Sequence, residues 1–163
     1  MTNRLELREI TAADVPRLRA SLIELAAWHN SVSEHFGDTE SSAGAWPVKP
    51  FETTLAGFDE ALRRGTSRIA VIESDDETRA VIGFAKVDID SVGQTGKIDY
   101  LVVRETFRGR GHGSRLMEWA MATLRRAAVT RIEVKVVAGN DGAIRLYEKH
   151  GFRVYAHLLW KNE

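Results

Sequence analysis

Hydrophobic and polar positions alternate in some stretches of this chain and recur with helical spacing in others. Alternation predicts strands at Arg4–Ile10, Ser67–Glu73 and Ala80–Asp90. The last two are joined through the polar turn Ser-Asp-Asp-Glu-Thr and therefore form a predicted hairpin. One apolar stripe has the spacing of a single helix face, which predicts that it packs into the core. Its members are Leu116, Met117, Ala120, Met121 and Leu124.

Helices are expected between several of these strands. Thr11 to Asp14 is a capping arrangement that opens a helix to about Trp28, and a second helix runs from about Glu52 to Arg64. Residues 30 to 50 are rich in serine, glycine and proline and have no clean period. A loop of this length in a compact domain is usually functional or mobile.

The last third of the chain continues the alternation of strands and helices. Arg131–Val137 reads as a strand, and a helix is expected to start near Asn140. The final segment Tyr155–Trp160 is apolar enough to be either a buried strand or a contact in a homodimer. The predicted order of elements is β-α-α-β-β-β-α-β-α-β.

Composition narrows the class of protein. The chain has 163 residues and is 44% hydrophobic, which suits one domain over residues 1–163. Its 23 basic and 23 acidic residues balance, so no general attraction to nucleic acid or to an anionic membrane is expected. The sequence contains no cysteine, its start is too charged for a signal peptide, and no apolar run could span a membrane. A cytoplasmic protein fits best.

The most informative stretch is residues 98–113, where an apolar strand runs into a basic glycine loop that opens a helix. Gly109, Gly111 and Gly113 remove the side chains that would keep a ligand off the backbone, and a helix start offers unpaired N–H groups to an anion. No Gly-Lys-Ser or Gly-Lys-Thr follows, which excludes a P-loop, and the G-x-G-x-G spacing counts against a dinucleotide site. The loop is therefore either a diphosphate site or a glycine-rich turn whose arginines face water.

A second motif lies one strand further along the chain. On a helix that starts near Asn140, residues 140, 143, 144 and 147 lie within about 100° of each other, so one face carries an amide, a small residue and a phenol. Together, Arg108-x-x-Gly111-x-Gly113 and Asn140-x-x-Ala143-x-x-x-Tyr147-x-x-x-Gly151-Phe152 resemble the two best-known motifs of the GNAT superfamily of N-acetyltransferases. The resemblance covers roughly residues 80 to 155.

The resemblance implies an α/β (α+β) fold with a mixed, mostly antiparallel sheet that is flanked by helices and splays between its fourth and fifth strands. It also implies acetyl-CoA as co-substrate. The strand Leu101, Val102 and Val103 would pair with the pantetheine arm, and Asn140, Ala143 and Tyr147 come from the helix whose asparagine and tyrosine flank the pantetheine and the sulfur. The loop that would bind the diphosphate comprises Arg108, Gly109, Arg110, Gly111, His112, Gly113 and Ser114.

Acyl transfer to an amine suggests two catalytic candidates. Asp99 is a candidate base, because strand alternation places it on the same face as Leu101 and Val103 unless a β-bulge intervenes. A carboxyl group with a pKa near 3.9 is a weak base, so a water relay, or an ion pair of Asp99 with Lys97 or an arginine, are the alternatives. Tyr147 would hydrogen-bond the departing thiolate, as the resemblance implies, or would merely pack against the sheet.

The acceptor is the least determined part of the reaction. Trp28, His29 and Phe36 lie around the long loop and are candidates to line an acceptor pocket. For His29 and His35, a surface or packing position is favoured over a role in the pocket. His29 and His35 are six residues apart and do not share a helix face, so no metal is expected. The predicted function is acetyl transfer to a primary amine of a small molecule or a protein; the alternative is an inactive acetyl-CoA sensor or interaction module.

Overall fold

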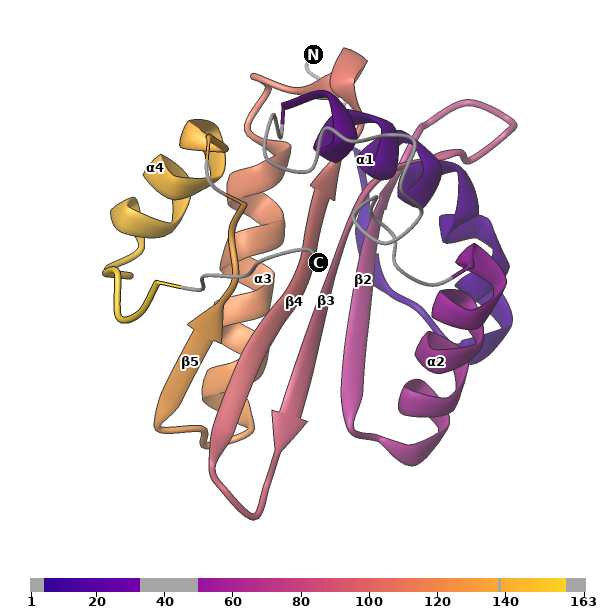
Figure 1. The fold of residues 1–163 in the computed structure, drawn as a ribbon. Helices are drawn as coiled ribbons and strands as arrows, with labels where there is room; N and C mark the ends of the chain where they lie inside the picture. The colour runs from indigo at the N-terminus through magenta and orange to yellow at the C-terminus, as the bar shows by residue number, and fades with distance from the viewer. Residues whose placement is uncertain (1–4, 33–49, 138, 158–163) are drawn as a thin grey trace, which may run out of the picture.

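The computed structural model describes residues 5–32, 50–137 and 139–157 (Figure 1). Its centre is a five-stranded sheet in the order β1-β2-β3-β4-β5. The first three pairings are antiparallel, and β4 and β5 pair in parallel. The strands are β1 (Leu7–Glu9), β2 (Ser67–Glu73), β3 (Val81–Asp90), β4 (Thr95–Val103) and β5 (Arg131–Val134).

Helices cover both faces of this sheet. Figure 1 shows α1 and α2 on one side, and α3 with α4 on the other. Across the described residues, no helix combines the length and the apolar character needed to cross a bilayer. The helical segments are η1 (Ala12–Leu18), α1 (Arg19–Val32), α2 (Phe51–Arg64), η2 (Glu105–Phe107), α3 (His112–Arg126) and α4 (Asp141–Lys149), where η denotes a 3₁₀-helix.

The first predicted helix consists of two pieces. The backbone N–H of Thr11 donates to the Asp14 carboxylate across 3.2 Å, as a capping arrangement requires. The segment that follows is the 3₁₀-helix η1, and α1 begins only at Arg19. Pro16 lies inside η1 and has no N–H to donate, which explains why a regular α-helix does not start at residue 12.

Each face of the sheet has its own core. On one face, the ring of Phe58 in α2 lies 6.5 Å from Phe84 and 5.0 Å from Tyr100, measured between ring centroids. On the other face, α3 packs its apolar stripe against Val87 and Ile98. Leu116, Met117, Ala120 and Leu124 are completely buried, so the predicted core stripe is confirmed for these four residues.

The last predicted strand is not seen in the described residues. After α4 the chain has no strand up to residue 157, and residues 158–163 lie outside the described part. Val154 and Tyr155 are 75% and 85% exposed, and the Arg131 guanidinium lies 4.8 Å from the Tyr155 ring centroid. The expectation of a buried strand therefore fails for residues 155–157, because they form no strand and are exposed to solvent.

The sheet opens between β4 and β5. The two strands pair only from Thr95 opposite Arg131 to Ile98 opposite Val134, although β4 continues to Val103. We call the point after Ile98 the fork. Above the fork, residues Leu101–Val103 pair with β3 on one side, and no described strand pairs with them on the other. The splay that the family resemblance implies is therefore present.

A β-bulge lies at the fork. Lys86 of β3 is opposite Tyr100, and Val87 is opposite Ile98, so Asp99 is an extra residue in β4 without a partner in β3. The bulge changes the alternation of side chains along the strand. Ile98 and Leu101 both pack against the α3 face although they are three residues apart.

Candidate functional site

The glycine loop has the backbone that the sequence predicts for an anion cradle. Gly109 and Gly111 have φ angles of 73° and 81°, in the left-handed region that favours glycine, and Gly111 is the N-cap of α3. A Cβ atom at either position would meet no protein atom within 4 Å, so the surface above both glycines is open. The first N–H groups of the 15-residue helix α3 have no partners within the helix. A diphosphate fits such a cradle.

The arginines around the cradle are already engaged with the protein. Arg108 donates through Nε to the Val103 carbonyl oxygen at 2.9 Å, and its guanidinium lies 5.3 Å from the Trp28 ring centroid. Arg115 donates to the Leu5 carbonyl oxygen at 2.6 Å, and Arg110 lies over the Phe107 ring at 5.7 Å. An incoming diphosphate therefore meets guanidinium groups that are held close to the loop.

His112 is the first residue of α3 and lies between these cations. Its Nδ1 atom is buried and has no hydrogen-bond partner among the described residues. Burial lowers the pKa of His112, and the charges of Arg115 and Arg110 lower it further. The ring is therefore neutral at physiological pH.

Glu24 of α1 supports the segment that leads into the loop, which the sequence did not reveal. One of its carboxylate oxygens accepts a 2.6 Å hydrogen bond from the Glu105 backbone N–H, and the other accepts a 2.8 Å hydrogen bond from Arg104 Nε. Burial would raise the pKa of Glu24, but these hydrogen bonds, together with nearby arginine charges, lower it. The 80 residues that separate Glu24 from Arg104 explain why no local pattern signalled this contact.

The backbone of β4 presents particular groups to the open edge. The N–H of Arg104 donates to Ile82 of β3, and N–H and C=O groups of successive residues in a strand point to opposite sides. Val103 and Leu101 therefore direct their amides and carbonyls to the open edge, whereas Val102 directs its own to β3. Of the three residues expected to meet a pantetheine arm, Leu101 and Val103 have the available backbone groups.

Asp99 does not lie on the face that simple alternation predicts. Its carboxylate is 2.9 Å from Lys86 Nζ, which lies 5.3 Å from the Phe58 ring centroid on the α2 side. Leu101 and Val103 instead pack on the α3 side, and the bulge explains the difference. Asp99 also binds the ammonium of Lys97.

These ion pairs affect the ability of Asp99 to accept a proton as a base. Burial would raise the pKa of Asp99, but hydrogen bonds from Lys86 and Lys97 and their charges outweigh burial and lower it. A carboxylate with a lowered pKa is a weaker proton acceptor. The role of Asp99 as base stays a prediction.

The second motif forms the start of α4. Asn140 is the N-cap, and its Oδ1 atom accepts a 3.2 Å hydrogen bond from the Ala143 backbone N–H. One turn further on, Tyr147 is only 8% exposed and joins the core cluster that contains Ile98 and Met117. Burial raises the pKa of Tyr147 to about 12, and no described residue forms a hydrogen bond with its hydroxyl group. The phenol is therefore protonated at neutral pH and can donate a hydrogen bond.

The three residues proposed to line the acceptor pocket are described unequally. Trp28 is half-buried near the end of α1 and contacts Arg108 as given above. The side chain of His29 and all of Phe36 lie outside the described residues. Within the described part, no group of three or more His, Asp or Glu side chains is arranged to hold a metal ion.

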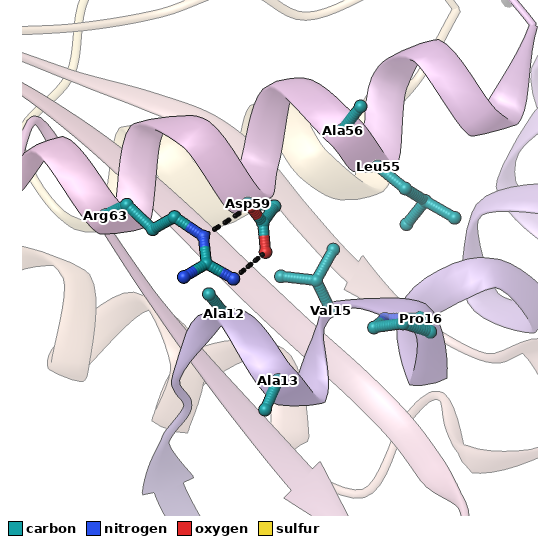
Figure 2. A pocket seen from close by; sticks show the side chains of 8 residues that line it. All are labelled: Ala12, Ala13, Val15, Pro16, Leu55, Ala56, Asp59 and Arg63. Carbon is teal, nitrogen blue, oxygen red and sulfur yellow. Dashed lines mark hydrogen bonds and ion pairs between the residues drawn. The ribbon is translucent and has the colours of Figure 1, made fainter.

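A pocket elsewhere on the molecule includes none of the predicted site residues. This cavity of about 370 Å³ lies between η1 and α2. Figure 2 shows the side chains that line it, among them the ion pair of Asp59 and Arg63. The cradle and the fork involve β4, α3 and α4, so the chemistry-bearing groups lie apart from this cavity. Its lining residues are Ala12, Ala13, Val15, Pro16, Leu55, Ala56, Asp59 and Arg63.

Comparison with solved structures shows the same fold in other proteins. An acetyltransferase from Trypanosoma brucei is 21% identical, with a TM-score of 0.68 over 98% of this chain and 100% of that chain. The PaiA N-acetyltransferase from Thermoplasma acidophilum, solved in complex with coenzyme A, is 16% identical, with a TM-score of 0.72 over 93% of this chain and 91% of that one.

Sequence comparison identifies the family. The chain is 30% identical over 90 residues to the uncharacterized N-acetyltransferase CgeE of Bacillus subtilis, which covers 55% of this chain and 34% of that protein. This chain thus matches about a third of the length of its curated relative. The model of the acetyltransferase (GNAT) family matches residues 25–152, which is most of the sequence. The protein belongs to the GNAT acetyltransferase family.

Proposed function

We propose that this protein transfers the acetyl group of acetyl-CoA to a primary amine of a small molecule or a protein. The observation that carries the proposal is the course of β4, whose open edge at Leu101–Val103 runs directly toward the glycine cradle at Gly111. A thioester with a diphosphate and an amide-containing arm matches both features, since the diphosphate fits the cradle and the amides of the arm can pair with the open edge of β4. The CoA complex of PaiA supports the same ligand, since that protein shares the fold.

The binding step uses the backbone more than side chains. N–H groups at the start of α3 and the nearby guanidinium groups hold the diphosphate, and the exposed N–H and C=O groups of Leu101 and Val103 pair with the pantetheine amides. The Val103 carbonyl oxygen now accepts a hydrogen bond from Arg108. Arg108 and the arm would compete for this oxygen, and we propose that Arg108 releases it when the arm binds.

Transfer itself is a direct displacement. The neutral amine attacks the thioester carbonyl carbon, a C–N bond forms, the C–S bond breaks, and the amine loses a proton to water or to a protein base. A backbone N–H at the open edge of β4, from Leu101 or Val103, stabilises the negative charge that develops on the carbonyl oxygen.

The departing sulfur needs a hydrogen-bond donor, and we assign that role to Tyr147. With its pKa at about 12 and a thiol near 8.5, full proton transfer from Tyr147 is uphill by roughly 5 kcal/mol. Tyr147 therefore donates a hydrogen bond to the thiolate, and solvent supplies the proton.

The decisive experiment measures thiol release from acetyl-CoA with a panel of primary amines, after calorimetry has established CoA binding. The panel contains alkylamines, arylamines, polyamines, aminoglycosides and lysine-containing peptides. Amine-dependent thiol release is the expected result. A protein that gives no calorimetric signal with CoA would refute the whole proposal, whereas tight CoA binding without release for any amine would favour the inactive sensor.

A further inference from the structure

Two lysines bind the carboxylate of Asp99, but their surroundings differ. The side chain of Lys86 is only 6% exposed, also binds Asp88, and lies over the Phe58 ring. The side chain of Lys97 is 35% exposed. A buried charge requires a fixed partner, whereas a partly exposed ion pair is weak and readily exchanged. Lys86 is thus a permanent counterion of Asp99, and Lys97 is a replaceable one.

The position of Asp99 relates it to the reaction. It is the bulge residue at the fork, four residues before Val103, which corresponds to about 13 Å along an extended strand. A thioester whose diphosphate lies at Gly111 extends along the open edge of β4 toward this point. Asp99 faces the α2 side of the sheet, whereas Tyr147 packs with the α3 cluster on the other side. An amine that enters from the α2 side would meet Asp99 first.

We propose that Asp99 binds the ammonium group of the acceptor, and that the Lys97 ammonium takes this place when no acceptor is bound. The inference rests on the proposed acetyltransferase function and narrows its substrate class. The acceptor is a primary alkylamine that arrives as a cation, because an alkylammonium is the group that Lys97 itself presents to Asp99. Lys86 keeps Asp99 in position and ionised while Lys97 leaves.

The charges at the fork permit an exchange of one cation for another. Asp88 and Asp99 bind the ammonium groups of Lys86 and Lys97, and Glu133, opposite Lys97 in β5, adds a third negative charge that acts on Lys97. An ammonium that takes the place of the Lys97 ammonium on Asp99 leaves the charge of that pair unchanged, and the partly exposed Lys97 side chain moves into water. The bound ammonium then loses its proton to water before its nitrogen attacks.

The test compares acceptors that differ in charge. In Asp99→Asn, the KM for the best alkylamine of the panel should rise about tenfold or more, because a hydrogen bond between charged groups is lost. The KM for an arylamine, which is neutral at the same pH, should stay within about twofold of its original value. In Lys97→Met, the KM for the alkylamine should fall, since the Lys97 ammonium no longer competes with the acceptor for Asp99. Asp59→Asn, which removes an exposed carboxylate from an ion pair with Arg63 on α2, is the matched control and should change neither value.

The outcomes separate this inference from the proposed function. Equal losses for charged and neutral acceptors in Asp99→Asn, an unchanged or raised alkylamine KM in Lys97→Met, or wild-type activity restricted to arylamines would each overturn it while transfer activity stands. If Asp99→Asn does not fold, Lys97→Met alone decides, because Lys97 is partly exposed and its replacement leaves the Lys86–Asp99 pair intact. Absence of transfer to every amine would refute the proposed function itself.

Discussion

Arg108 Nε and the carbonyl oxygen of Val103 are joined by a 2.9 Å hydrogen bond that lies on the open edge of β4. The same guanidinium lies 5.3 Å from the ring centroid of Trp28, near the end of α1. One side chain thus connects the strand that would hold the thioester arm with an aromatic residue of α1. We expect an arm that pairs with Val103 to displace Arg108 from this carbonyl oxygen.

Trp28 should therefore report CoA binding. Titration with CoA is expected to change tryptophan emission, because movement of Arg108 removes a cation from the Trp28 ring. In Trp28→Phe this change should be largely lost. Trp119→Phe is the control, since Trp119 donates to Glu9 on the opposite side of the sheet and should leave the change intact. A full response in Trp28→Phe would show that the signal does not come from Trp28 and would contradict this prediction.

Gly111→Ala should weaken CoA binding far more than it destabilises the protein. A non-glycine residue with φ near 81° costs about 1–2 kcal/mol, and the added methyl group would project where the ligand lies. We expect the calorimetric Kd for CoA to rise at least about tenfold, while melting remains cooperative. Gly142→Ala is the matched control in α4, where a Cβ atom also meets nothing and φ is not left-handed. Equal CoA affinity in both variants would argue against the cradle.

Tyr147→Phe should slow turnover without emptying the CoA site. Loss of one hydrogen bond to the departing thiolate corresponds to about tenfold in kcat, and the ring would keep its packing against Phe152. The measurement is steady-state thiol release together with the calorimetric Kd for CoA. Unchanged turnover would show that Tyr147 only packs, and a lost CoA signal would show that its hydroxyl group serves binding.

Glu73 should make the free energy of unfolding depend on pH. Burial opposes its ionisation, but hydrogen bonds from Arg8, Arg79 and Arg17 outweigh burial and lower its pKa to about 2. Because the folded-state pKa lies below the unfolded value of about 4.3, the stabilisation is complete above pH 5 and is lost as pH falls toward 2. Glu73→Gln should lower the free energy of unfolding by about 3 kcal/mol at pH 7.

The pH dependence provides the check on that value. Urea unfolding at pH 7 and at the lowest pH that keeps both proteins folded should show the gap between wild type and Glu73→Gln narrowing with acid. Glu60→Gln removes an exposed carboxylate paired with Arg64 and should change stability by less than about 1 kcal/mol at either pH. A gap independent of pH would mean that packing, and not ionisation, is what Glu73 contributes.

Local chemistry explains which features the sequence could predict. The glycine loop at Gly111 and the cap at Asn140 depend on residues close in the chain, and the structure places both at helix starts. The bulge at Asp99 depends on how β3 and β4 align, and the Glu24 contact joins residues 80 positions apart. No local pattern encodes such pairings. The capping arrangement at Thr11–Asp14 predicts a regular helix, but Pro16 interrupts it.

The face of Asp99 was the main difference within the candidate site. Alternation holds along β4 only while each residue has a partner, and the unpaired residue shifts every position beyond it. The same shift brings Asp99 to the face of Lys86, a contact that alternation along the sequence does not predict. Among the acceptor candidates, Trp28 is the one whose side chain the structure describes, and its ring lies under the guanidinium of Arg108.

The extra residue in β4 also has a consequence for redesign of the strand. Removing Asp99 would leave Ile98 and Leu101 on the faces they now occupy, with Tyr100 between them on the other, so a shortened strand could keep both cores. Deleting any core residue of β4 instead would put wrong side chains into one of them. The bulge thus adds to β4 one residue that neither core requires, and its carboxylate binds Lys86 and Lys97 instead.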